Sequence, residues 1–538
     1  MTSNNEITPF GSAEWASPRQ AEKVGLFRFH ENAHYTGHLG KQNLYFNGDG
    51  GVLDFAGARA GKGTCFIIQN ICAGLGRKRT QIILACKGDL PQIAANQTAD
   101  NKAVYCWNLE GRDGLLLDSL NPLEPLTASS PTLQADIKTV VQGLIPPSGD
   151  GKAKYFEGRA RDVMEGLLYA LTLRDGEATL PALYQVINLA LIGGSGWSDF
   201  ADDMSAAASP LCFRIRKEIE VFHADPHGAM KDIIGEVTNA VSCLSDPNLM
   251  RVVSPPFNCS IADDLCGKDR FANLFIVCEA ERMVTHAPII KAMLSALFVT
   301  KARKPDAPRQ EWVLDECALL GGFDLVPKLF SYGAGLGIRP WAIFQNPAQM
   351  DVLGHKARQI IMASAQLQRF YGIREPDTAR LLSEMIGDQT LEIDDELVQG
   401  RADVDRRKLW NAVMHGADPF AVVKELHQKE YETSHKRKLR RRLVNPDEIR
   451  HLPHNNHLVF TDGLSGPLLA ERTPYWQQRW MAGRYLGDPY HPPTDSVIVQ
   501  TRWGARRRAI VTEPVPQEFA HLPQYRDGMW SYIEGFKP

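Results

Sequence analysis

Paired cysteine motifs, long apolar runs and an excess of charge of one sign are all missing from this 538-residue sequence. The ten cysteines are scattered, with no C-x-x-C pair and no Cys/His group at the spacing of a zinc site. This pattern argues against a disulfide-stapled or zinc-ribbon protein. Buried free thiols in a reducing cytosol explain these cysteines best.

Targeting and membrane-spanning segments are also missing from the sequence pattern. Residues 1–18 have neither the basic start nor the apolar run of a signal peptide. The apolar stretch at residues 289–299 is too short to cross a bilayer, and it contains Lys291. We therefore expect a cytoplasmic protein that does not itself span a membrane.

The charge balance gives no general signal for nucleic acid. Sixty basic residues stand against 63 acidic residues, and the formal net charge is -3. Any DNA-binding surface must therefore be a local patch. Two basic clusters, residues 435–442 and Arg502 with residues 506–508, are candidates for contacts with phosphates. The alternative is that both are solvated surface, which is the commoner role of such runs.

The hydrophobic pattern alternates between strands and helices in the first part of the chain. Residues 44–55 are typical of strand, turn and strand, and the second strand runs into a Gly/Ala-rich loop. An apolar helix from Phe66 to Ile71 and a further apolar run at residues 81–86 follow. This order is a βαβ unit, which predicts a parallel sheet. Strand patterns return later, at residues 271–277, 312–314, 341–344 and 367–371.

The middle of the chain, from about residue 133 to residue 260, follows a helical period instead. One helix face collects Phe156, Ala160, Val163, Met164, Leu167, Leu168 and Leu171. Prolines punctuate the entry to this segment and its exit. The pattern predicts an all-α domain inserted into an α/β domain. Residues 400–442 are polar and charged, and we predict a surface extension or loop there.

A candidate phosphate loop occupies residues 56–64, AGARAGKGT, between a predicted strand and a predicted helix. Small residues let backbone N–H groups turn inward around phosphates, and the helix N-terminus adds a positive dipole. Lys62 would place its ammonium between the β- and γ-phosphates. The candidate nucleotide-binding residues are Gly57, Ala58, Arg59, Ala60, Gly61, Lys62, Gly63 and Thr64.

The match to G-x-x-x-x-G-K-[ST] is imperfect in two places. Ala56 stands where the first glycine is expected, and Gly63 stands where a hydroxyl residue binds magnesium. Thr64, one position later, is the candidate for that hydroxyl. The alternative is a glycine-rich turn with an exposed lysine.

Two further strand ends carry polar groups that suit phosphate chemistry. Asp315 and Glu316 follow an apolar strand, where the first carboxylate would hold magnesium and the second would orient and polarise the attacking water. Gln345 ends the strand after that, where an amide can sense the γ-phosphate. Solvated acids and a strand-end cap are the alternatives, but the phosphate loop upstream favours catalysis.

These segments together resemble the type IV secretion coupling proteins, the ATPases of conjugative DNA transfer. The resemblance covers most of the chain. It includes GSAEWA at residues 11–16, the loop at 56–64, LNPL at 120–123, and LDE at 314–316. It continues through GAGLGIR at 333–339, FQN at 344–346 and LVNPDEI at 443–449. An initial Ala and a Gly after the Lys both occur in the family's phosphate loop.

The resemblance implies an α/β fold: a RecA-like P-loop domain with a mostly parallel sheet and an inserted all-α domain. The predicted boundaries are 1–130 for the first part of the RecA-like domain with an N-terminal extension, 131–262 for the all-α domain, and 263–538 for the second part with a C-terminal extension. It also implies ATP and Mg²⁺ as cofactors, and a homo-oligomer, a hexameric ring with a central channel. The implied partners are DNA, an effector or relaxase protein, and components of the secretion channel.

The sequence departs from the family pattern at two points. Many members begin with a transmembrane anchor, and none is visible here, so we expect a soluble variant recruited to the inner membrane by a separate partner. Some members carry an arginine finger in the Gly-rich turn, where this chain has Ala334. Arg339 is the nearest candidate for that catalytic role, and an arginine bonded to local backbone is the alternative.

Two rival functions stay open at this point. One is a soluble DNA translocase outside secretion. The other is an adaptor that docks substrates through its helical domain and uses nucleotide only to stabilise assembly.

Overall fold

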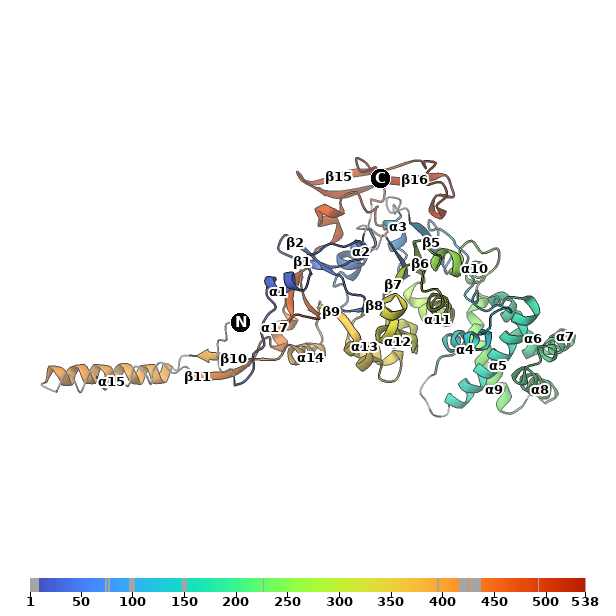
Figure 1. Cartoon of the computed structure of the whole chain (residues 1–538), viewed down its shortest axis with the longest axis horizontal. Coiled ribbons are helices and arrows are strands. Elements are labelled where there is room, and N and C mark those ends of the chain that lie inside the picture. The colour runs from blue at the N-terminus through green and yellow to red at the C-terminus, as the bar shows by residue number, and fades with distance from the viewer. Residues whose placement is uncertain are drawn as a thin grey trace.

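A computed structural model describes residues 9–537 except for 73–74, 76–77, 96–101, 148–150, 152, 226, 394–395, 416–423, 425–436 and 492. A large sheet forms the centre of the molecule (Figure 1). A cluster of helices lies beside it, a small sheet near the C-terminus lies above it, and a helical arm extends on the opposite side (Figure 1).

The central sheet has eleven strands in the part of the chain that the structure describes, in the order β2-β1-β13-β12-β9-β3-β8-β7-β4-β6-β5. The run from β9 to β5 is parallel throughout. The other four strands extend the sheet antiparallel beyond β9. The strands are β1 (His34–Leu39), β2 (Gln42–Phe46), β3 (Gly51–Ala56), β4 (Arg79–Ala85), β5 (Ala103–Asn108), β6 (Ala272–Val277), β7 (Arg309–Leu314), β8 (Ile338–Phe344), β9 (Ala365–Tyr371), β12 (Asn456–Thr461) and β13 (Leu468–Glu471).

Strands β3, β4, β6 and β8 are buried along their whole length, as expected for parallel strands covered on both faces. Continuous apolar runs, rather than alternating ones, are the sequence pattern of such strands, which is why they were recognisable. The α/β class with a mostly parallel sheet is confirmed.

The helical region leaves the sheet after β5 and returns to it at β6. Its helices are α4 (Leu133–Leu144), α5 (Ala153–Asp175), α6 (Leu180–Ile192), α7 (Ser195–Ala206), α8 (Pro210–Ala224), α9 (Ala229–Val241) and α10 (Pro247–Val252). The predicted apolar face of residues 156–171 lies on α5, and of its members only Phe156 is not fully buried. The helical insertion is therefore present, while the exact limits at 130 and 262 stay predictions.

Helix α11 (Ala280–Arg303) links the sheet to this helical region. It packs along α4, and Arg303 forms an ion pair with Asp136 there. Among the described residues, α11 is the one helix long and apolar enough to cross a bilayer, but 78% of its apolar window is buried inside the protein. Burial of that kind is typical of a core helix.

The described residues between 388 and 442 form the arm that leaves the body (Figure 1). Strands β10 (Asp388–Ile393) and β11 (Arg437–Arg442) pair antiparallel at its base, and α15 (Glu396–Met414) continues outward. The surface extension expected at 400–442 is thus a helix and a strand where it is described. Residues 416–423 and 425–436, with the start of the basic cluster at 435, lie outside the described residues.

The C-terminal region adds a separate antiparallel sheet of β14 (Ser496–Thr501), β15 (Gly504–Pro514) and β16 (Met529–Ile533). All ten cysteines of the chain are buried, and none forms a disulfide.

Candidate functional site

The phosphate loop lies between β3 and a helix that begins with one π-helical turn, Gly63–Ile67, and continues as α2 (Ile68–Cys72). The N–H of Gly57 donates to the Tyr371 carbonyl over 3.2 Å. A Cβ at Gly57 would lie 2.1 Å from the Gly372 carbonyl oxygen, so only glycine lets the loop pass this close to the end of β9. Arg59 has a positive φ of 58°, and its side chain is exposed together with Ala58.

A buried arginine, Arg472, holds this loop through a hydrogen bond to its backbone. The Arg472 guanidinium donates to the carbonyls of Ala60 and His454, and it stacks 4.9 Å from the ring centre of Tyr371. Its exposed fraction is 2%. Arg472 lies 412 positions from Ala60 in the chain, so no sequence pattern pointed to it.

Four of the predicted side chains meet where three neighbouring strands end. The Lys62 Nζ lies 2.8 Å from Asp315 Oδ1 and also contacts Glu316 Oε1. The Gln345 amide Nε2 donates to Glu316 Oε2 over 3.3 Å. Strands β3, β8 and β7 are adjacent and parallel, so their carboxyl ends bring the loop, Gln345 and the acid pair to one edge of the sheet.

Backbone geometry directs Glu316 into this cluster. Its φ of 51° and ψ of 42° place it in the left-handed region, which a glutamate rarely adopts. Such outliers persist where surrounding contacts hold them, and they cluster at functional sites.

The charges of the cluster compensate one another. Burial alone would lower the pKa of Lys62, but the carboxylates of Asp315 and Glu316 outweigh it and raise that pKa above its ordinary value. Burial raises the pKa of Asp315, and the Lys62 ammonium offsets part of this effect. The Lys62 side chain therefore stays protonated and forms ion pairs with both carboxylates.

The residues suited to a divalent cation are Asp315 and Thr64. The Asp315 Oδ1 is buried and, apart from the ion pair with Lys62, has no hydrogen-bond partner among the described residues. The Thr64 hydroxyl, two positions after the lysine, donates to the Gly61 carbonyl over 3.3 Å. A carboxylate oxygen and a nearby hydroxyl are the hard oxygen donors that Mg²⁺ accepts, so the residues present fit the ion.

Arg339 lies at the other end of its strand, away from this cluster. It is the second residue of β8, at the opposite end from Gln345, and its exposed fraction is 6%. The guanidinium lies 3.3 Å from Glu311 Oε1 and donates to the carbonyls of Gly48 (2.5 Å) and Asn32 (3.4 Å). Burial lowers the pKa of Arg339 to about 9. The carbonyls that Arg339 contacts belong to residues 291 and 307 positions away, so its partners are not local in the chain. A catalytic role across a subunit interface stays a prediction.

A second buried arginine stabilises β3 directly before the loop. Arg369 binds Asp54 through two hydrogen bonds of 2.7 and 2.8 Å, and both side chains are fully buried. Trp341 Nε1 and the Tyr371 hydroxyl also donate to Asp54. No motif spacing indicates this pair, because its partners lie 315 positions apart.

Comparison with known proteins identifies the family to which this sequence is similar. The family model for conjugative DNA transfer by the type IV secretory system matches residues 7–405. A conjugal transfer protein TraG of Escherichia coli is 21% identical over 443 residues, covering 73% of this chain and 66% of that protein. TraG of Agrobacterium fabrum (strain C58) is 23% identical over 269 residues, covering 49% of this chain and 36% of that protein. The chain thus spans about two thirds or less of the length of these relatives.

Solved structures agree on the fold. The plasmid coupling protein TrwB in complex with ADP and Mg²⁺ has a TM-score of 0.59 at 16% identity, covering 86% of this chain and 94% of that one. The unbound bacterial conjugative coupling protein TrwBdeltaN70 has a TM-score of 0.58 at 17% identity, covering 85% of this chain and 92% of that one. With a family model that matches most of its length, this chain belongs to the type IV secretory system conjugative DNA transfer family.

Proposed function

We propose that this chain is an ATP-hydrolysing coupling protein that recruits a substrate and drives it into a type IV secretion channel. The observation that carries the proposal is the meeting of Lys62, Asp315, Glu316 and Gln345 at the carboxyl ends of adjacent parallel strands. These groups come from separate parts of the chain, and together they supply the cation, carboxylates and amide that phosphoryl transfer to water needs.

The chemistry follows from the positions of these side chains. The backbone of the phosphate loop binds the phosphates, and Lys62 moves from the carboxylates to the β- and γ-phosphates. That movement frees Glu316, which orients the attacking water and accepts its proton. The Gln345 amide, which donates to Glu316 at the end of β8, contacts the γ-phosphate when it is present. Arg472 and the Arg369–Asp54 pair keep the loop in place during this exchange.

Magnesium would be held by Asp315 and Thr64, and when bound it would neutralise charge on the phosphate oxygens. The complexes of TrwB with ADPNP and with ADP and Mg²⁺ support the assignment of nucleotide and magnesium as cofactors here.

The proposed assembly is a hexameric ring in the cytoplasm, peripheral at the inner membrane through a separate partner. The proposed cargo is DNA, an effector or a relaxase protein. Membership of the conjugative transfer family supports this choice of partners.

The two basic clusters differ as candidate DNA contacts. In the first, Arg440 is paired with Asp388, and Arg442 lies within 4.0 Å of the same carboxylate. In the second, Arg506 and Arg507 lie exposed on β15, and Trp503 in the turn before this strand has an exposed fraction of 79%. Exposed arginines and an exposed aromatic ring on one hairpin suit a nucleic-acid strand, because arginines bind phosphates and the ring can stack on a base. The β14–β15 hairpin is therefore the favoured contact.

An ATPase assay with and without single- and double-stranded DNA, together with the measured oligomeric mass, tests the proposal. Turnover that DNA stimulates and that is lost in Lys62→Ala supports a motor. Binding of substrate peptide without turnover would instead favour the adaptor, and genomic neighbours without channel or relaxase genes would favour a translocase outside secretion. Turnover that survives in Lys62→Ala would refute the site.

A further inference from the structure

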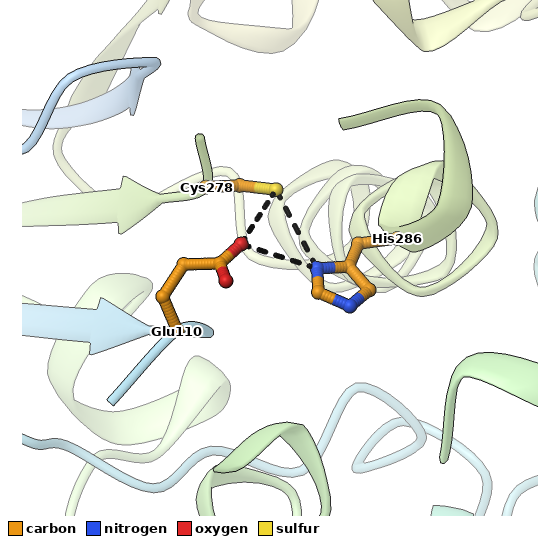
Figure 2. Close-up of side chains that lie close together, drawn as sticks. All are labelled: Glu110, Cys278 and His286. Atoms are coloured by element: carbon orange, nitrogen blue, oxygen red, sulfur yellow. Dashed lines mark hydrogen bonds and ion pairs between the residues drawn. The ribbon is translucent and has the colours of Figure 1, made fainter. Parts of the chain in front are cut away.

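Three donor atoms from two parts of the chain converge at a second place on the same edge of the sheet. Figure 2 shows Glu110, Cys278 and His286 pointing toward one another. The Cys278 Sγ lies 3.7 Å from Glu110 Oε1 and 3.6 Å from His286 Nδ1, and these last two atoms are 3.5 Å apart. The three atoms thus form a nearly equilateral triangle.

The size of this triangle matches the first coordination shell of zinc. Zinc bonds of about 2.3 Å to sulfur and about 2.0–2.1 Å to nitrogen and oxygen, at tetrahedral angles, separate the ligand atoms by about 3.3–3.6 Å. The observed separations exceed these values by about 0.2 Å or less. A cation would therefore need almost no rearrangement of the side chains.

Rigid elements hold each donor in place. Glu110 follows the end of β5, Cys278 follows the end of β6, and His286 lies in the second turn of α11. Strands β5 and β6 are adjacent and parallel, so the first two donors come from neighbouring strand ends. Cys278 is fully buried, and the side chains of His286 and Glu110 are 4% and 5% exposed. Precise placement of buried donors is what distinguishes a metal site from a chance surface group.

A neighbouring arginine orients the carboxylate of this cluster. Arg282 Nη1 lies 2.5 Å from Glu110 Oε2, so the ion pair engages one oxygen and leaves Oε1 toward the thiol and the imidazole. Outer contacts of this kind fix the direction of a metal ligand. Arg282 itself is half exposed.

We propose that Glu110, Cys278 and His286 bind one Zn²⁺ ion per chain, with water in the fourth position. Thiolate, imidazole and carboxylate together favour zinc over Mg²⁺, which prefers oxygen donors only. Binding releases the thiol proton to solvent, and the charges of Cys278 and Glu110 then balance those of the ion. In the sheet order β4 lies between β6, which ends directly before Cys278, and β7, which ends directly before Asp315. The two sites share no side chain, so this proposal does not rest on the proposed function.

The ion would fasten two strand ends to the start of α11, the helix that packs along α4 of the helical region. Its expected effect is on stability, because an ion that binds the folded chain and finds no preformed site in the unfolded chain stabilises the fold. The plain alternative is a buried Glu110–Arg282 ion pair with a cysteine and a histidine beside it.

The test uses the full-length chain, reduced and freed of metal by chelation, without nucleotide. Titration with Zn²⁺ should give one tightly bound equivalent by elemental analysis and raise the melting temperature. Co²⁺ in its place should give the near-ultraviolet charge-transfer band of a cobalt–thiolate bond. Cys278→Ser and His286→Ala should lower zinc affinity at least about 100-fold, and Glu110→Gln about 10- to 100-fold.

The matched control is Cys212→Ser, because Cys212 is also a buried thiol and lies on α8 in the helical region. This variant should bind zinc as the parent chain does. Absence of stoichiometric zinc from the parent chain, or of the cobalt–thiolate band, would overturn the proposal and favour the plain ion pair. Undiminished binding in folded Cys278→Ser would also overturn it. The cobalt spectrum of the parent chain keeps the test decisive even if a variant fails to fold.

Discussion

Replacing Glu316 with glutamine should separate nucleotide binding from turnover. In the structure Lys62 contacts both carboxylates, and the side chains of Lys62 and Glu316 are 24% and 22% exposed. An ion pair of this exposure lies between surface pairs, worth about 0.2–1 kcal/mol, and buried pairs, whose disruption costs about 3–5 kcal/mol. We therefore assign about 1–2 kcal/mol to the contact with Glu316.

This free energy opposes nucleotide binding, because Lys62 must leave the carboxylate to reach the phosphates. Glu316→Gln removes the competing charge, so a non-hydrolysable ATP analogue with Mg²⁺ should bind about 5- to 30-fold more tightly. Loss of the general base should lower kcat at least about 100-fold.

Isothermal titration with the analogue and steady-state phosphate release measure the two effects. Glu236→Gln is the matched control, since Glu236 lies exposed on α9, and both quantities should stay at parent values there. Weaker or equal analogue binding in Glu316→Gln would contradict the competition between carboxylate and phosphate. Preserved turnover would remove Glu316 from the reaction.

The other predictions concern binding, the core and its pH dependence. Lys62→Ala should abolish analogue binding in the same titration, because the phosphates lose their cation; binding at the parent affinity would contradict the site. Burial lowers the pKa of Lys291 to about 8 from 10.5, so the folded state disfavours its charge. Lys291→Met should therefore raise the free energy of unfolding at pH 7 by up to about 3 kcal/mol. That gain should shrink as the pH rises from 8 to 10.5, where the lysine of the parent chain folds uncharged, and a gain independent of pH in denaturant titrations would refute this reasoning. Arg369→Met should cost about 3–5 kcal/mol in the same assay by leaving the buried carboxylate of Asp54 unpaired, while the double change with Asp54→Asn should cost less than the sum of the two single changes.

The nucleotide-binding edge of the sheet could be predicted from the sequence, because each of its strands and the functional groups after it lie close together in the chain. Strands β3, β7 and β8 each end in apolar residues. Asp315 and Gln345 directly follow β7 and β8, and the loop that carries Lys62 follows β3. Parallel strands end at one edge, so a lysine-bearing loop and an acid pair on β3 and β7 had to lie close together.

Strand neighbours and side-chain contacts between remote parts of the chain could not be predicted from these local patterns. Residues 44–55 were predicted as strand, turn and strand, yet β2 and β3 are separated in the sheet by β1, β13, β12 and β9. Which strands become neighbours is decided by long-range burial rather than by the turn between them. Arg472 was missed for the same reason, since Ala60 lies 412 positions away. The Glu110–Cys278–His286 cluster was missed because Glu110 lies 168 positions from Cys278, and the Cys278–His286 pair alone matches no metal motif.

The burial of all ten cysteines has a practical consequence for site-specific fluorescent labelling of this protein. Thiol-reactive dyes need an accessible thiolate, so the native chain should label slowly under non-denaturing conditions. A single cysteine introduced on the outer face of α15 would then be the fast-reacting position, without prior removal of any native thiol. Fluorescence from a dye at that point would follow the arm directly in an otherwise unaltered protein.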